Sequence, residues 1–213
     1  MSLKVNEIYF SIQGESTHAG RSCIFIRLTY CNLRCSYCDT EYAFYEGKDM
    51  EINEILIEIK TWNCNLVEVT GGEPLFQDKC INLLQELIDS GYEVLLETGG
   101  SLSIKNVPKE VKKIIDFKCP SSGMENKNLW SIVNDVMLHD EIKFVIGSRL
   151  DFDWVKRKIT KYNLDDRCTL LMSPNFGIIE PSQIVEWILK DDLPVRMQIQ
   201  VHKYIWKPET KGV

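Results

Sequence analysis

Short β-branched runs alternate with amphipathic stretches along most of this 213-residue chain. Runs of this kind, roughly four to eight residues long, are typical of strands buried in a parallel sheet. The predicted strands lie at residues 23–28, 66–70, 93–97, 113–117, 142–146, 168–172 and 195–200, with a weaker candidate at 5–9. No linker, repeat or low-complexity tract interrupts the pattern, which predicts one α/β domain over residues 1–213.

The stretches between these strands carry apolar residues at helical spacing. They predict helices near residues 52–62, 81–88, 154–159 and 184–189, the second closed by Gly91 and the fourth preceded by Pro181. A full eight-unit barrel takes about 250 residues. The connection 101–112 contains Pro108 and is too short for a full crossover helix. We therefore expect a partial, truncated (βα) TIM-like barrel.

Charge and cysteine usage narrow the class of protein. The net charge is −6 and no Lys/Arg-rich block occurs, so direct nucleic-acid binding is not expected. The apolar runs are far shorter than a membrane span and the N-terminus lacks an apolar signal region, so we expect a cytoplasmic protein without membrane contact. Eight cysteines in such a protein are core residues or ligands rather than disulfides.

Unusual residues follow several of the predicted strands. In a parallel βα architecture the carboxyl ends of the strands lie on one rim, where such folds place their ligand sites. Glycine and proline are common in any such turn, so a single turn is weak evidence. Four together favour a site: residues 71–74, 98–100, 118–122 and 173–175.

Three cysteines, Cys31, Cys35 and Cys38, follow the first strong strand. A structural zinc site takes four ligands, whereas three thiolates on a four-iron, four-sulfur cluster leave one iron open. A zinc or redox-sensing binding module remains an alternative. Cys119 could supply a fourth thiolate, but a strand-end thiol is the preferred interpretation. The remaining cysteines stand in apolar contexts and are expected in the core: Cys23, Cys64, Cys80 and Cys168.

The spacing Cys-x3-Cys-x2-Cys, with Tyr37 before the last cysteine, resembles the cluster motif of the radical S-adenosylmethionine (SAM) superfamily. The segment 71–74, Gly-Gly-Glu-Pro, resembles that superfamily's motif for the SAM amino group. The resemblance implies a 4Fe-4S cluster on the three cysteines and SAM on the open iron. It implies these SAM-binding residues: Ser36, Tyr37, Asp39, Gly71, Gly72, Glu73, Glu97, Ser121, Ser122 and Asn175.

Two further segments, Ser-Ile-Gln-Gly-Glu at 11–15 and Cys-Asp-Thr at 38–40, resemble the 7-carboxy-7-deazaguanine synthase family. Members of that family are lyases. They act in the biosynthesis of queuosine and other 7-deazapurines, a tRNA modification pathway. They convert 6-carboxy-5,6,7,8-tetrahydropterin by hydrogen abstraction, ring contraction and loss of ammonia, with Mg²⁺ required. The resemblance implies that Thr40 binds Mg²⁺, assigns no acid or base residue, and implies these substrate contacts: Ile12, Gln13, Gly14, Glu15, Arg27 and Thr70.

The family resemblance also implies partners and a layout. We expect a small-molecule pterin substrate, an electron donor such as flavodoxin or ferredoxin, and a homodimer. The iron-sulfur loop is expected at about residues 29–41, and a tail at about 203–213 without helical periodicity closes the substrate site. An enzyme that activates glycyl-radical enzymes shares the cysteine spacing and remains an alternative.

Overall fold

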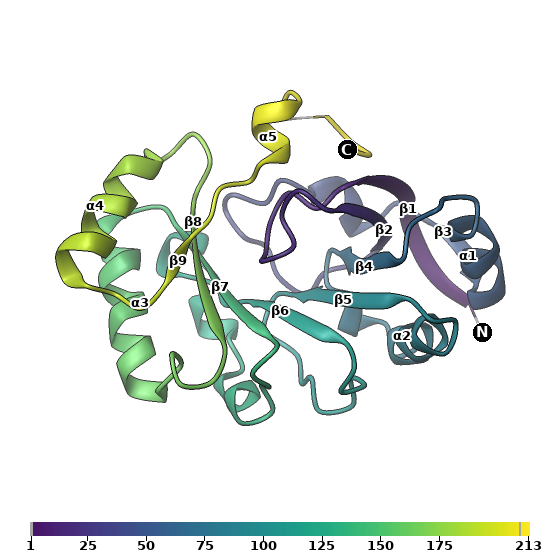
Figure 1. The fold of residues 1–213 in the computed structure, drawn as a ribbon, viewed down its shortest axis with the longest axis horizontal. Helices are drawn as coiled ribbons and strands as arrows, with labels where there is room; N and C mark the ends of the chain where they lie inside the picture. The colour runs from purple at the N-terminus through teal and green to yellow at the C-terminus, as the bar shows by residue number, and fades with distance from the viewer. Residues whose placement is uncertain (1, 209) are drawn as a thin grey trace.

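The computed structural model describes residues 2–208 and 210–213, which form one nine-stranded sheet with helices on its outer face (Figure 1). The strands are β1 (Ser2–Ile12), β2 (Ser22–Leu28), β3 (Lys48–Glu51), β4 (Leu66–Gly71), β5 (Glu93–Thr98), β6 (Lys112–Asp116), β7 (Glu141–Ile146), β8 (Thr169–Pro174) and β9 (Arg196–Met197). The helices are α1 (Ile52–Ile59), α2 (Cys80–Asp89), α3 (Arg149–Tyr162), α4 (Pro181–Asp191) and α5 (His202–Ile205).

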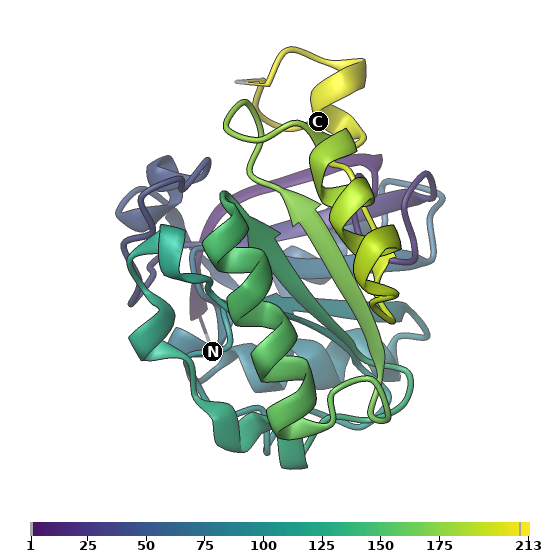
Figure 2. The same cartoon turned by 90° about the vertical axis from the view of Figure 1, so that its left-hand side faces the viewer.

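The sheet has the strand order β3-β1-β2-β4-β5-β6-β7-β8-β9. Every neighbouring pair from β2 to β9 is parallel. The two ends of this order do not pair with each other, so the barrel is open and the predicted partial barrel is confirmed. Figure 2 shows α3 and α4 on the outer face of the sheet, where they pack on β7 and β8.

Three features differ from the predictions. β1 pairs antiparallel with β2 and β3, because residues 13–21 are too few for the crossover that parallel neighbours require. β3 was not predicted at all. The run predicted at 195–200 forms only the two residues of β9; beyond them the side-chain amides of Gln198 and Gln200 donate to Glu15.

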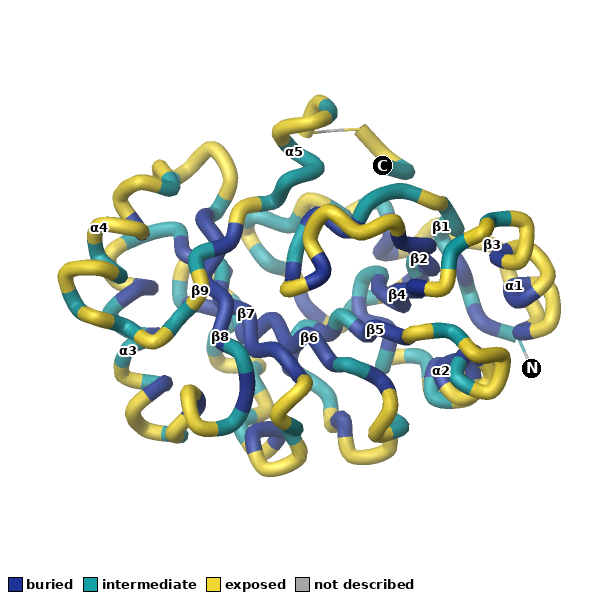
Figure 3. Tube along the Cα trace, in the orientation of Figure 1, coloured by how far each residue is buried: buried dark blue, intermediate teal, exposed yellow. Residues whose placement is uncertain are grey.

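The two faces of the parallel strands carry different residues, because alternate side chains point to opposite faces. The outer face is apolar and buried under the helices, as Val67 and Val69 of β4 illustrate (Figure 3). The inner face has two layers. Towards the amino ends of the strands lies a small apolar cluster: Cys23, Phe25, Leu66, Leu95 and Ile114. Towards the carboxyl ends the inward side chains are polar, and these form the site described below.

The helices are held by this apolar outer face rather than by their own propensity. The buried residues of α1 are Ile52, Ile55, Leu56 and Ile59, and each contributes about 1.5–3 kcal/mol on burial. α2 and α4 also appear where the apolar spacing predicts them, and α4 begins at Pro181. Between β5 and β6 the described residues contain no helix. None of the described helices combines the length and apolar character needed to cross a bilayer.

Candidate active site

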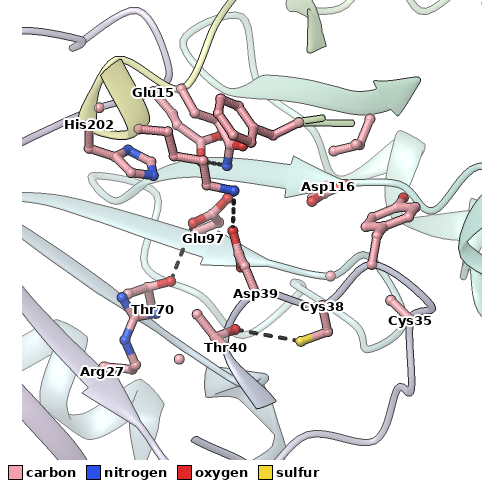
Figure 4. A pocket seen from close by; sticks show the side chains of 18 of the residues that line it. Glu15, Arg27, Cys35, Cys38, Asp39, Thr40, Thr70, Glu97, Asp116 and His202 are labelled. Carbon is pink, nitrogen blue, oxygen red and sulfur yellow. Dashed lines mark hydrogen bonds and ion pairs between the residues drawn. The ribbon is translucent and has the colours of Figure 1, made fainter. Parts of the chain in front are cut away.

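A cavity of about 960 Å³ opens at the carboxyl ends of the parallel strands. Its walls come from the cysteine loop, from the turns after β4 to β8, from the end of β1 and from the C-terminal tail. Figure 4 shows Glu15 and His202 together at one side of this cavity, and Cys35 and Cys38 at another. The volume is at the upper end of the range for small-molecule sites.

The three cysteines line this cavity from one irregular loop. All three thiols are free and partly exposed. Burial raises the pKa of Cys31, and that of Cys35 to about 11, so cluster binding would displace protons. Among the described residues no three His, Cys, Asp or Glu side chains stand close enough to hold a single metal ion. Three free thiols on one loop at the cavity wall suit a four-iron cluster, which takes one thiolate on each of three irons and leaves the fourth iron open.

The glycine turn after β4 packs on the cysteine loop. A Cβ on Gly71 would lie 2.2 Å from the Leu28 carbonyl oxygen, and one on Gly72 would lie 2.2 Å from that of Tyr30. Gly71 also has φ +151°. The close neighbour of both glycines is thus the chain's own backbone. Both glycines nevertheless line the cavity.

Glu73 does not line the cavity. Its carboxylate is fully buried and accepts hydrogen bonds from the backbone of Leu75 and Gly99 and from the Thr98 hydroxyl, at 2.7–3.0 Å. Burial raises the pKa of Glu73 despite these donors. The Glu73 carboxylate thus ties the turn after β4 to the turn after β5, and its assignment to SAM stays a prediction.

Of the other residues assigned to SAM by resemblance, most line the cavity and one does not. Ser122 lies outside the cavity, and its buried hydroxyl donates to the Cys119 carbonyl at 2.6 Å. The Ser36 hydroxyl donates to the Ser121 carbonyl at 2.7 Å, which links the cysteine loop to the turn after β6. The cavity is lined by Ser36, Tyr37, Asp39, Glu97, Ser121 and Asn175. Cys119 is fully buried outside the cavity, as expected for a strand-end thiol.

The residues assigned to the substrate all line the cavity: Ile12, Gln13, Gly14, Glu15, Arg27 and Thr70. Arg27 projects inward from β2; its Nε donates to Glu7 at 2.8 Å and its terminal nitrogen to the Tyr9 hydroxyl at 2.9 Å. The Gln13 side-chain Nε2 donates to the Glu68 carboxyl group, and its Oε1 accepts from the Glu15 backbone N–H at 2.9 Å. Thr40 lines the same cavity, 3.7 Å from the Cys38 sulfur (Figure 4).

The sequence reasoning missed a buried charge network centred on Lys143 of β7. The Lys143 ammonium pairs with Glu15, with Glu97 at 2.9 Å and with Asp116 at 3.9 Å. Burial opposes its charge, but the carboxylates of Glu15 and Glu97 outweigh burial and hold the pKa of Lys143 well above its usual value. Glu97, Asp116 and Lys143 occupy inward positions of β5, β6 and β7, whereas Glu15 lies in the loop after β1. Polar residues at alternate positions of a buried strand were the signal that could have revealed them.

Glu68 of β4 belongs to the same interior and was also missed. It is 2% exposed, and burial together with the nearby carboxylates of Glu97 and Glu15 raises its pKa well above the ordinary value. A neutral Glu68 can hold the Gln13 amide without adding another buried negative charge. The cavity interior therefore combines the ammonium groups of Lys143 and Lys118, a Glu15 carboxylate that is held ionised, and a Glu68 carboxyl group that favours its protonated form.

The C-terminal tail lies beside the cavity mouth. Contrary to the expectation, the tail contains the short helix α5, and the Val201 backbone just before it donates to the Gly14 carbonyl at 2.9 Å. The Lys203 ammonium pairs with Asp39 of the cysteine loop at 2.7 Å. Further along, the Lys211 ammonium lies 4.1 Å from the centre of the Tyr42 ring. The tail residues that line the cavity are His202, Lys203, Pro208, Thr210, Lys211, Gly212 and Val213.

The chain is similar to known proteins in both sequence and fold. The sequence profile of the radical SAM superfamily matches residues 25–122. A 7-carboxy-7-deazaguanine synthase of Koribacter versatilis is 42% identical over 99% of this chain and 100% of its own length. One of Chlorobaculum tepidum is 44% identical over 99% of this chain and 97% of its own. The crystal structure of QueE from Escherichia coli shares the fold, with a TM-score of 0.78, 21% identity and 95% of each chain covered.

Proposed function

The chain belongs to the 7-carboxy-7-deazaguanine synthase family of the radical SAM superfamily, and we propose that it forms 7-carboxy-7-deazaguanine from 6-carboxy-5,6,7,8-tetrahydropterin. One observation supports this most strongly: a single cavity of about 960 Å³ is lined by the cysteine loop and by the segment 12–15. The matched relatives are synthases over nearly their whole length, which favours this reaction over glycyl-radical activation or a zinc module.

In this proposal Cys31, Cys35 and Cys38 hold a 4Fe-4S cluster. When bound, the reduced cluster and SAM supply one-electron, hydrogen-abstracting chemistry. The backbone of Gly71 and Gly72 lies at the cavity wall and offers polar groups to the SAM amino group. Glu73 contributes by fixing this turn, since its carboxylate is occupied by the chain itself.

The pterin side of the cavity is proposed to work by orientation. The Arg27 guanidinium matches a carboxylate in charge and shape, and it is held in place by Glu7 and Tyr9. Gln13 and Glu15 offer an amide and a carboxylate to the polar edge of the substrate ring. Lys143 keeps the Glu15 carboxylate ionised, so that it accepts rather than donates hydrogen bonds.

Thr40 is the proposed protein ligand of Mg²⁺. Its hydroxyl is a hard oxygen donor at the cavity wall, as Mg²⁺ prefers, and substrate oxygens and waters would complete the coordination. Asp39, the neighbouring carboxylate, is paired with Lys203 of the tail. The same ion pair supports the proposal that the tail, residues 203–213, closes the substrate site. In this proposal the tail belongs to the same single domain as the rest of residues 1–213.

The surroundings of the enzyme are also part of the proposal. We infer a cytoplasmic homodimer that receives electrons from a donor such as flavodoxin or ferredoxin. The reductant is required by the superfamily's chemistry, and the eight free thiols suit a reducing compartment. Size-exclusion chromatography with light scattering tests the dimer, and reduction of the cluster by each donor tests the choice of donor.

The decisive experiment is a turnover assay. Anaerobically reconstituted protein is incubated with dithionite, SAM, Mg²⁺ and 6-carboxy-5,6,7,8-tetrahydropterin, and the products are identified by mass spectrometry. We expect 7-carboxy-7-deazaguanine to accumulate. Accumulation of 5′-deoxyadenosine without that product would refute the substrate and keep the superfamily chemistry. Formation of neither from iron-loaded protein would refute both.

A further inference from the structure

The loop between β1 and β2, residues 13–21, lies across the amino ends of the parallel strands; we name it the floor loop. Its first three residues, Gln13, Gly14 and Glu15, line the cavity. Its later residues bind the first residues of three consecutive strands, which are Glu93 of β5, Lys112 of β6 and Glu141 of β7. The floor loop therefore connects the cavity to the amino ends of β5, β6 and β7.

The tightest of these connections is at Glu141. Its carboxylate is fully buried, and both oxygens accept from the Thr17 backbone at 3.2 Å. The Thr17 hydroxyl donates to the same carboxylate. The Lys112 ammonium lies 2.6 Å from Glu141 and 2.7 Å from the Thr17 hydroxyl. A buried carboxylate with all its partners in place holds them in one geometry, because losing any partner leaves a buried charge uncompensated.

A second connection holds the far end of the floor loop. Glu93 accepts two hydrogen bonds from Arg21, at 2.8 and 2.6 Å, and lies 3.1 Å from His18 Nε2. Directly before both anchors, Ser16 adopts φ +62°, a left-handed conformation that costs about 1–3 kcal/mol for a non-glycine residue. Its backbone N–H donates to Gln198 at 2.8 Å. The loop conformation is thus imposed by its partners and not by its own preference.

We propose that the Glu141–Thr17–Lys112 cluster is a positioning device for substrate recognition. Thr17 follows Glu15 by two residues, so a displacement of Thr17 moves the backbone from which Glu15 projects. The Glu15 backbone also binds the Gln13 side chain, so both recognition groups shift together. Misplacement by about 1 Å is costly when groups must meet a ligand in fixed geometry. This inference rests on the proposed function, which assigns Gln13 and Glu15 to the pterin.

The test compares two substitutions of one residue. Thr17→Val keeps the shape but removes the hydroxyl that joins Glu141 and Lys112, whereas Thr17→Ser keeps the hydroxyl. We expect Thr17→Val to raise the KM for the pterin roughly tenfold, the effect of losing one charge-assisted hydrogen bond. Thr17→Ser is expected to restore a KM near that of the wild type. The iron content and the SAM dissociation constant should be the same in all three proteins.

Thr160→Val, on the exposed face of α3, is the matched control and should leave the KM unchanged. A Thr17→Val protein with a lower unfolding midpoint but an unchanged KM would reduce the cluster to a structural anchor and overturn the inference. A parallel measurement of pterin dissociation constants separates the two proposals. If the wild type binds the pterin without converting it, only the function fails, and the ratio of dissociation constants for Thr17→Val and Thr17→Ser decides the positioning role. Absence of pterin binding would overturn both.

Discussion

The two ends of the parallel strands differ in how their buried polar groups are bound. At the carboxyl ends, three partly exposed thiols face the cavity, and the buried Tyr37 hydroxyl and Asp116 Oδ1 have no hydrogen-bond partner among the described residues. At the amino ends, Glu93 and Glu141 are bound by side chains of the floor loop. Buried polar groups are normally paired. The described residues also leave the buried His18 Nδ1 at the amino ends without a partner, so the two ends differ chiefly in that Tyr37 and Asp116 line a large cavity open to a ligand, whereas Glu93 and Glu141 are bound by the protein itself.

The largest effect is expected at the ligand end. Cys35→Ser replaces a proposed cluster ligand, so reconstituted protein should lose the cluster absorbance and iron content, and product should fall below detection. The matched control is Cys64→Ser, a partly exposed thiol outside the cavity, which should retain wild-type iron content. A Cys35→Ser protein that still binds about four irons and turns over would contradict the assignment of the cysteine loop.

The second effect concerns the interior between the two ends. Lys143→Met removes the ammonium that pairs with Glu15 and Glu97 and leaves these two carboxylates without an ion-pair partner among the described residues, whereas Asp116 keeps Lys118 at 2.9 Å. We expect the free energy of unfolding to fall by about 3–5 kcal/mol, measured by urea denaturation. Lys156→Met removes an ammonium from the helix surface and should leave the unfolding midpoint close to that of the wild type. An equal fall in the free energy of unfolding for the two variants would show that the interior network stabilises the fold no more than a surface ion pair does.

A moderate effect is expected where the tail meets the floor loop. A Cβ on Gly14 would lie 2.1 Å from His202 Nδ1, so Gly14→Ala must displace either the tail or the loop. We expect a several-fold rise in the KM for the pterin and faster proteolysis of the tail. His202→Ala in the same chain removes the clashing ring and should restore tail protection, a non-additive result in a double-mutant cycle. Strictly additive effects would contradict the steric explanation.

The smallest expected effect is on the pH dependence of stability and involves the floor loop. Burial and the nearby Lys112 lower the pKa of His18, so below about pH 6.5 the unfolded chain binds a proton that the folded chain resists. The hydrogen bonds from Arg21 lower the pKa of Glu93 to about 2, so its contribution is lost only as the pH falls below about 4.5. His18→Gln should therefore reduce the loss of stability between pH 7 and pH 5, measured by urea denaturation. An unchanged pH dependence would exclude His18 as its source.

Local patterns in the sequence were sufficient to indicate the superfamily and its cofactors. The cysteine spacing, the glycine turn and the apolar periodicities of α1, α2 and α4 are each contained in a few consecutive residues, and all were recognised. The Gly-Gly-Glu-Pro turn was located correctly, but the contacts of Glu73 were not, because its partners Thr98 and Gly99 lie on the next strand.

Tertiary structure decided what depends on residues far apart in the chain. The antiparallel place of β1, the pairing of Lys143 with Glu15 and the contact of His202 with Gly14 each join distant segments. No local preference specifies these contacts, since they arise only when the sheet brings inward side chains of different strands together. The sequence by itself determined which cofactor chemistry the chain can support. The fold decided which polar groups remain available to a ligand, because buried polar groups bind the partners that packing places beside them.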